Sequence, residues 1–213
     1  MFKLLKSLVR GTFQKTTIRG NQNEVVQINI ENNFAGVDYL KEQINSTSDA
    51  RLKRFFESYL DSETGPVPFG GRGDEISLLD RWLNDPLTPN RMLITAPAGR
   101  GKSAILVHWA SALIRHVSDD HRKIERHVIF VPISIRFGTN LPSTFYKIIS
   151  QKLAFIFSET IPTPAVDPQQ FYADQARAYL DRIKLGNIRI VLIVDGIDEA
   201  LGGNFDTSIF PIG

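Results

Sequence analysis

The stretch LITAPAGRGKSAIL, residues 93–106, joins an apolar run, a loop of small residues and a helix-forming run. The pattern predicts a short strand before the loop and an amphipathic helix after it. From Ala96 onward the residues follow the spacing small residue, four residues, Gly, Lys, Ser, with alanine at the first position in place of glycine. Small residues let backbone amides converge on an anion, and the first amides of the helix point to the same place. The stretch therefore predicts a loop that binds phosphate groups.

Two side chains of this loop have chemistry of their own. The Lys102 ammonium is expected to reach the β and γ phosphates of a nucleotide, and the Ser103 hydroxyl to bind Mg²⁺. Lys102 is accordingly predicted to be catalytic as well as nucleotide-binding. The predicted nucleotide-binding residues of the stretch are Ala96, Pro97, Ala98, Gly99, Arg100, Gly101, Lys102, Ser103 and Ala104.

A partner motif lies in IRIVLIVDGIDEA, residues 188–200. Its apolar run predicts a buried strand, and Asp195 follows at the carboxyl end, where open α/β sheets bind ligands. Asp195 is predicted to hold Mg²⁺ directly or through water. Gly196 is expected to let the chain pass close to the nucleotide. Asp198 and Glu199 are the candidate catalytic acids that orient or deprotonate the attacking water.

The rest of the chain predicts an α/β architecture. Helical spacing over 74–85, 101–117, 143–157 and 168–183 alternates with strand patterns over 91–96, 127–137 and 188–198. This alternation predicts a parallel sheet flanked by helices, of the P-loop NTPase type, over residues 66–213. The Gly- and Pro-rich stretch at 62–73 marks a domain boundary.

Residues 1–62 are predicted to form a small α+β appendage. The expected elements are a short basic helix over 1–15, a hairpin around residues 20–30 and a broken helix over 38–61. Phe55 and Phe56 are expected to pack the appendage onto the following domain. No set of nucleophile, base and orienting residue is recognisable here, which favours an adaptor or oligomerisation element over an enzyme.

VDGIDEA resembles the corresponding motif in the NACHT branch of the STAND class of P-loop NTPases. PFGGRGDEISLLDRWL, residues 68–83, is similar to the motif that opens the NTPase domain in that class, roughly Phe-x-Gly-Arg-x-x-Glu. The resemblance covers residues 66–213 and places Phe69, Gly71 and Arg72 near adenine and ribose. It implies an ATP-dependent signalling switch with Mg²⁺ that self-associates through the NTPase module, in immunity or anti-phage defence. A C-terminal region would recognise the trigger.

One strand of that class has no counterpart in this sequence. In the class, a sensor strand lies between the phosphate-loop strand and the Mg²⁺ strand, and this sequence stops at FDTSIFPIG, about where it would begin. The resemblance thus implies an incomplete sheet, and we expect the chain to be part of a longer protein or to complete its sheet with another chain. Nucleotide binding is the safer expectation for this chain, and hydrolysis is expected of the full protein.

Composition narrows the remaining function classes. The formal charge of +2, from 25 basic and 23 acidic residues, does not favour nucleic acid as a partner. It weighs against one alternative, an AAA+ ATPase acting on DNA, but leaves open a non-catalytic nucleotide-binding module.

Zero cysteines and no membrane-spanning run favour a cytoplasmic location. The four histidines lack metal-ligand spacing. Arg136 is expected to be a solvated arginine at a strand end, with a phosphate-sensing or interface role as the alternative.

Overall fold

The computed structural model describes residues 14–17, 50–62, 65–119, 126–186 and 188–200. The predicted hairpin around residues 20–30, the first part of the helix over 38–61 and the stretch after Ala200 lie outside these residues. So does most of the predicted basic helix over 1–15. Its last two positions, Gln14 and Lys15, belong instead to a strand, where they precede the β-branched pair Thr16 and Thr17.

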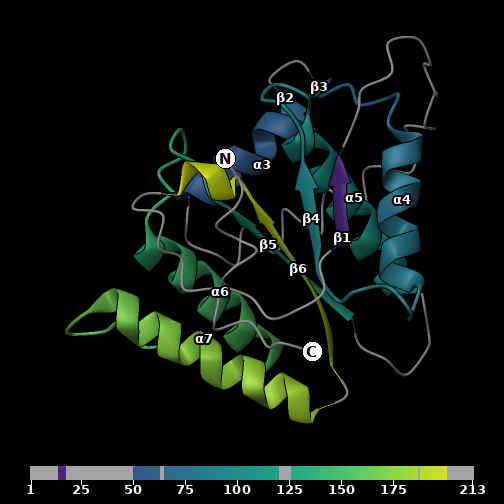
Figure 1. Ribbon diagram of the computed structural model, residues 1–213. Coiled ribbons are helices and arrows are strands. Elements are labelled where there is room, and N and C mark those ends of the chain that lie inside the picture. Colours follow the sequence, from purple (N-terminus) through teal and green to yellow (C-terminus); the bar gives the residue numbers. More distant parts are fainter. Residues whose placement is uncertain (1–13, 18–49, 63–64, 120–125, 187, 201–213) are drawn as a thin grey trace.

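The described residues form a mixed α/β fold (Figure 1). Its strands are β1 (Gln14–Thr17), β2 (Asp61–Ser62), β3 (Gly65–Pro66), β4 (Met92–Thr95), β5 (Arg126–Pro132) and β6 (Arg189–Asp195). Its helices are α3 (Ala50–Leu60), α4 (Gly73–Asn84), α5 (Lys102–Asp119), α6 (Pro142–Ile156) and α7 (Pro168–Leu185), with a 3-10 turn η2 at Ile197–Glu199.

From α4 onward, the sequence patterns locate the helices and strands to within a few residues, except for the end of β5. Local chemistry explains the helix ends: α6 and α7 each have proline in the first turn, where a missing amide proton costs nothing. The Asp167 side chain caps α7 by accepting a hydrogen bond from Gln170 N. The strand predicted over 127–137 is too long, because β5 ends at Pro132 and the chain then turns back on itself.

The strands form two parallel pairs and one short antiparallel pair. β1 pairs in parallel with β4, and β5 pairs in parallel with β6 in a register that sets Pro132 opposite Asp195. Figure 1 shows α6 and α7 on one side of β5 and β6, with α4 on the other. In the described residues no ladder of hydrogen bonds joins β4 to β6, so the predicted parallel sheet is present as two separate pairs.

The side chains of β5 and β6 alternate between two apolar clusters, as expected for strands buried on both faces. On one face Phe130 and Ile193 pack in a cluster with α4 and α5. On the other face Val131 packs in a cluster with α6 and α7. Helix α3 contributes to both clusters, since Phe55 and Phe56 belong to the first and Leu52 to the second.

Phe55 and Phe56 make the contact that the sequence predicts between the N-terminal part and the rest of the chain. Their ring centroids lie 5.9 Å and 5.2 Å from that of Phe130 on β5. Both side chains are at most 4% exposed. Helix α3 therefore shares its core with residues that follow the predicted boundary at 62–73.

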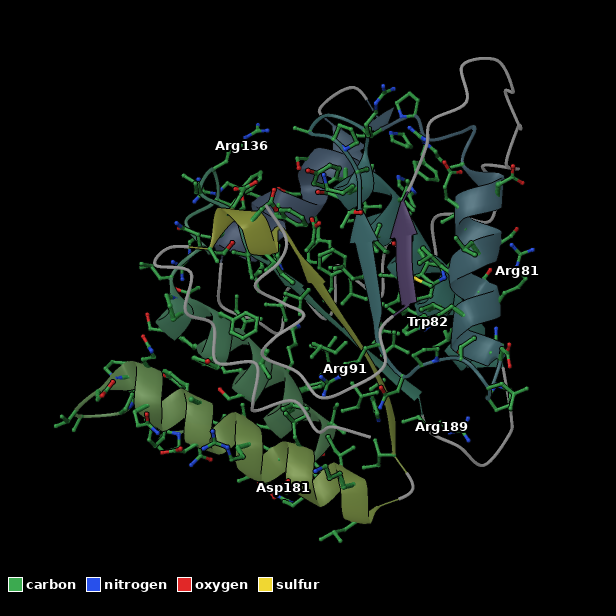
Figure 2. The ribbon with its side chains drawn as sticks, in the orientation of Figure 1. Arg81, Trp82, Arg91, Arg136, Asp181 and Arg189 are labelled. Carbon is green, nitrogen blue, oxygen red and sulfur yellow. The ribbon has the colours of Figure 1, made fainter. Side chains whose placement is uncertain are left out.

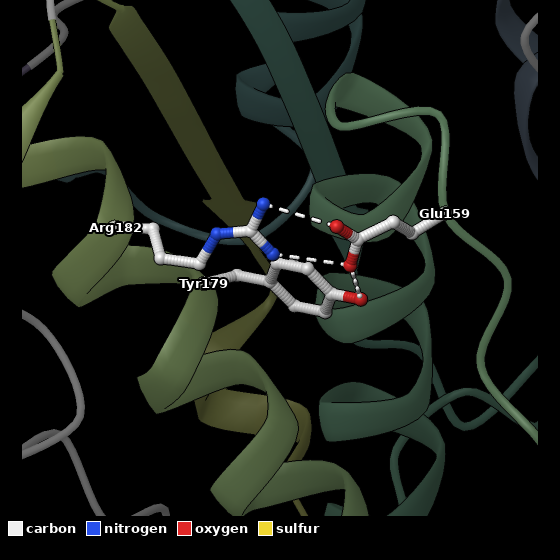
Figure 3. A network of polar contacts seen from close by, with 3 residues as sticks. All are labelled: Glu159, Tyr179 and Arg182. Atoms are coloured by element: carbon white, nitrogen blue, oxygen red, sulfur yellow. Dashed lines mark hydrogen bonds and ion pairs between the residues drawn. The ribbon is translucent and has the colours of Figure 1, made fainter.

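A polar network ties the end of α6 to α7 (Figure 3). The Arg182 guanidinium donates to both carboxylate oxygens of Glu159, each at 3.0 Å, and the Tyr179 hydroxyl donates to Glu159 Oε2 at 2.9 Å. The same guanidinium lies 4.0 Å from the ring centroid of Phe157. This arrangement fixes the turn that carries the chain from α6 toward α7.

Candidate functional site

In the loop between β4 and α5, two glycines adopt backbone conformations that other residues rarely adopt. Gly99 and Gly101 adopt φ angles of +74° and +77°, in the left-handed region that favours glycine. Residues 97–100 are exposed. The first helical hydrogen bond of α5 runs from Ile105 N to Gly101 O at 3.0 Å, so the amides of Lys102, Ser103 and Ala104 precede it. We call residues 96–101 the glycine-rich loop.

Lys102 closes this loop on itself. Its Nζ donates to Ala96 O at 2.9 Å and lies 3.5 Å from Pro97 O. The ammonium is therefore held across the mouth of the loop by two carbonyl groups, which are weaker partners for a cation than a charged phosphate. A phosphate in the loop would offer the same ammonium a stronger acceptor.

Asp195 lies beside the first residues of α5. Its side chain is 7% exposed at the end of β6, and burial raises the pKa of its carboxyl above the ordinary value. A hydrogen bond from the Ser103 hydroxyl and the charge of Lys102 lower that pKa, but the effect of burial is larger. The structure thus brings together Lys102, Ser103 and Asp195, which the two sequence motifs predicted as one site.

Lys102 and Asp195 lie along a groove of about 200 Å³ lined by both β4 and β6. Apolar side chains from α4 and α5, including Leu79 and Leu106, also line the groove. Its polar contributors are Thr95, Lys102, Asp195 and Asp198. The polar residues of the candidate site therefore line one part of a groove whose other lining residues are mostly apolar.

The two candidate acids after β6 have different surroundings. Asp198 lines the groove together with Lys102 and Asp195, whereas Glu199 is not among its lining residues. Instead, Glu199 Oε2 accepts a hydrogen bond of 2.8 Å from the amide of Ile135, in the loop that follows β5. The sequence motif treats the pair as equivalent, and the structure separates them.

Gly196 serves the packing of two strands. Its φ angle is +78°, and a Cβ at this position would meet Ile133 O of the neighbouring chain segment. Ile133 N in turn donates to Asp195 O at 2.8 Å. The close approach that requires glycine is thus to the chain that follows β5. The predicted approach of Gly196 to a nucleotide stays a prediction.

Of the three residues that the resemblance places near adenine and ribose, Arg72 contacts the glycine-rich loop and Phe69 contacts α5. Arg72 donates through Nη2 to Arg100 O at 3.1 Å, and its Nη1 is 3.0 Å from Glu75 Oε1. The ring of Phe69 stacks on His108 of α5, with centroids 3.9 Å apart and planes inclined by 13°. Gly71 between them has a φ of +67°. Arg72 therefore connects the start of α4 to the tip of the loop.

Arg136 lies in the loop after β5 and points outward (Figure 2). Its guanidinium carbon is 5.1 Å from the ring centroid of Phe137, and the residue is exposed. In Figure 2 it lies well away from Arg91, which precedes β4, and from Arg189, the first residue of β6.

In the loop after β5, the sequence singled out Arg136, with a phosphate-sensing role as the alternative, but not the residues that contact Glu199 and α3. Its contacts connect residues far apart in the chain: Ile135 to Glu199, 64 positions away, and Arg51 to Gly138, 87 positions away. Rules based on the spacing of residues along the chain do not predict contacts between such distant residues. The local signal for the turn is Gly138, a glycine with a φ of +67°.

Within the described residues, no three His, Cys, Asp or Glu side chains come together in a group that could hold a metal ion. None of the helices in that part of the chain has the length and apolar character required to cross a membrane. No protein-family model matches the sequence, and no curated protein or solved structure matches it either.

Proposed function

We propose that residues 66–200 form a nucleotide-binding module, which takes ATP as its Mg²⁺ complex at the glycine-rich loop. The observation that supports it best is the convergence of Lys102, Ser103 and Asp195 where β4 and β6 end. A cation, a hydroxyl and a buried carboxyl beside the N-terminus of an 18-residue helix match the needs of a triphosphate and its metal.

The donor set fits Mg²⁺. This ion is usually held in proteins by one or two oxygen ligands together with substrate phosphates and water, so a larger cluster of acids is not required. Asp195 and Ser103 would hold it, and its charge would favour the ionised form of the buried Asp195 carboxyl. When bound, Mg²⁺ supplies charge neutralisation for the phosphate oxygens.

The remaining residues would share the work around the triphosphate. Lys102 would exchange its carbonyl partners for phosphate oxygens, and the amides of residues 102–104 would donate to the same group. Asp198, which lines the groove, is the residue placed to accept a proton from an attacking water. Arg72 would hold the tip of the glycine-rich loop through Arg100 O.

The wider role in this proposal comes from the motifs. The resemblance of residues 66–213 to NACHT-like STAND ATPases supports a nucleotide-controlled signalling switch that self-associates, with immunity or anti-phage defence as its setting. ATP is proposed over GTP on the same ground, because the described residues contain no contact that distinguishes the two bases.

Equilibrium binding of a fluorescent ATP analogue in the presence of Mg²⁺ tests the module directly. We expect saturable binding by the chain and a loss of at least about tenfold in affinity for Lys102→Ala, because an ion-assisted hydrogen bond contributes about 1.5–3 kcal/mol in typical cases. Asp195→Asn should remove most of the gain in affinity that Mg²⁺ gives over EDTA.

Lys184→Ala is the matched control, since this exposed lysine at the end of α7 pairs with Asp181 and lies outside the site. It should bind as the unmodified chain does. Equal affinity of Lys102→Ala and the unmodified chain, or no binding by the unmodified chain, would contradict the proposal.

A further inference from the structure

The loop that follows β5, residues 134–139, is a closed turn held by its own hydrogen bonds. Thr139 N donates to Ser134 O at 2.9 Å, and the Thr139 hydroxyl accepts from Ser134 N at 3.0 Å. Thr139 is fully buried, and Gly138 N donates to Ile135 O at 3.2 Å. The loop therefore presents its Ile135 amide outward in a defined direction.

That amide is the group that holds Glu199. Ile135 N donates to Glu199 Oε2 at 2.8 Å, across the carboxyl ends of β5 and β6. A glutamate on a short 3-10 turn has three rotatable side-chain bonds, so an unanchored carboxylate would spread over many positions. A hydrogen bond from a backbone amide to a carboxylate is one of the stronger ways to select one position.

Helix α3 holds the same loop from the other side. Arg51 Nη1 donates to Gly138 O at 3.1 Å, and the Arg51 side chain passes close to Gly138. The ring of Phe137 meets that of Phe55 edge-on at 5.5 Å. Phe55 is 3% exposed and packs on Phe130 of β5 as well, so α3 offers a rigid base for these contacts.

We propose that Arg51 is a positioning residue for Glu199. It fixes the Gly138 carbonyl, the closed turn transmits this constraint to the Ile135 amide, and the amide orients the Glu199 carboxylate at the carboxyl end of β6. The inference rests on the proposed function, in which Asp198 accepts a proton from the attacking water, and it takes Glu199 as the second of two acids after β6 that serve this chemistry. It adds that a helix before the predicted domain boundary controls the geometry of one of them.

Amide hydrogen exchange at Ile135, measured by NMR on the whole chain without nucleotide, tests the link independently of activity. Arg51→Met removes the donor and keeps most of the apolar stem. We expect exchange at Ile135 to be about tenfold faster in this variant, approaching the rate in Glu199→Met, which has no acceptor oxygen, because the local opening that exposes the amide becomes easier. Arg51→Lys, which can still donate to one carbonyl, should restore part of the protection.

Arg54→Met is the matched control on the same helix. The Arg54 side chain is exposed and bonds Ala50 O within α3 at 3.4 Å, so its loss should leave Ile135 unchanged. An unchanged exchange rate at Ile135 in Arg51→Met would overturn the inference. So would equal acceleration in Arg54→Met, because the effect would then be a general loosening of α3.

Turnover and binding measured on the same variants separate this inference from the proposed function. Arg51→Met should lower kcat for MgATP several-fold, on the order of 3- to 30-fold, with the affinity for the fluorescent ATP analogue unchanged within about twofold. Weakened binding with unchanged kcat would overturn the positioning role. Absence of ATP binding by the unmodified chain would instead refute the proposed function, while the exchange measurement would still decide whether Arg51 orders the turn.

Discussion

Gly196 shows how a single residue can be required by two constraints together. It has a left-handed φ angle of +78°, and it faces Ile133 O where a Cβ has no room. The first constraint penalises any L-residue by about 1 kcal/mol or more. The second applies because β5 and β6 stay in contact up to the hydrogen bond between Ile133 N and Asp195 O.

Gly196→Ala should lower the free energy of unfolding by about 2–4 kcal/mol, since torsional strain and a backbone clash add. Chemical denaturation followed by circular dichroism measures this change. Gly99→Ala provides the comparison, because Gly99 has a similar φ of +74° and a Cβ added there would have no other atom within 4 Å. It should lose about 1 kcal/mol, from the torsion alone. Equal losses in the two variants would show that the contact with Ile133 O carries no cost.

For single residues, the sequence predicted those that directly follow a recognisable loop or end a recognisable strand. Lys102 and Ser103 follow the glycine-rich loop directly, and Asp195 ends a strand whose apolar run is unmistakable. The separation of Asp198 from Glu199 was not predictable, because it depends on an amide in another loop. The burial of Asp195, which raises its pKa, likewise depends on how β6 packs.

Among the elements, α6 and α7 illustrate how a surface network can make stability depend on pH. The Arg182 guanidinium, followed by the Tyr179 hydroxyl, holds the pKa of the Glu159 carboxyl below its ordinary value of 4.5. A carboxyl whose folded pKa is depressed contributes stability above its unfolded pKa and loses that contribution as pH falls through the folded pKa. The contribution is therefore complete at neutral pH and absent in strong acid.

Glu159→Gln should lower the thermal midpoint at pH 7 and have no effect well below the folded pKa, so the difference between the two thermal midpoints should shrink as pH falls below about 4.5 and vanish in strong acid. Differential scanning calorimetry over this range provides the measurement. Asp174→Asn serves as the reference. Both ion pairs are exposed, but Asp174 meets Arg177 through one bond of 3.3 Å, whereas Glu159 accepts two bonds of 3.0 Å from Arg182 and a third from Tyr179, so the Asp174 pair should contribute less. A constant difference between Glu159→Gln and the unmodified chain at every pH would contradict the assigned cause.

Periodicity predicted these elements well where one face of a helix or strand is buried. It extended β5 too far, because the apolar Ile133, Ile135 and Phe137 continue the strand pattern through the closed turn. The chain reverses there through hydrogen bonds between Ser134 and Thr139 and between Ile135 and Gly138, which a pattern of alternating residues does not reveal. The parallel pairing of β1 with β4 was missed because Gln14–Thr17 carries no apolar signal.

For the molecule as a whole, α3 raises the question of where the domain begins. The composition of residues 62–73 predicts a boundary, yet Phe55, Phe56 and Leu60 belong to the same apolar cluster as α4 and α5. A helix with its apolar face in the common core should unfold together with that core.

Phe56→Ala tests this cooperativity. Phe56 is 4% exposed, and its loss should lower the free energy of unfolding by about 3–5 kcal/mol and move the single main melting transition. If α3 belonged to an independent appendage, the main transition would keep its midpoint and only a minor one would shift. Phe155→Ala is the control, since Phe155 is 59% exposed and its removal should change the midpoint little.

The groove between β4 and β6 also has an optical consequence. The sequence contains two tryptophans, Trp82 and Trp109, and both line this groove with Lys102 and Asp195. Their indole nitrogens are engaged with Pro89 O and with the Asp80 carboxylate, which holds each ring in place. Both tryptophans of the chain are therefore held in one groove. Their intrinsic fluorescence should change when a ligand enters or leaves that groove, so its occupancy can be measured without a label.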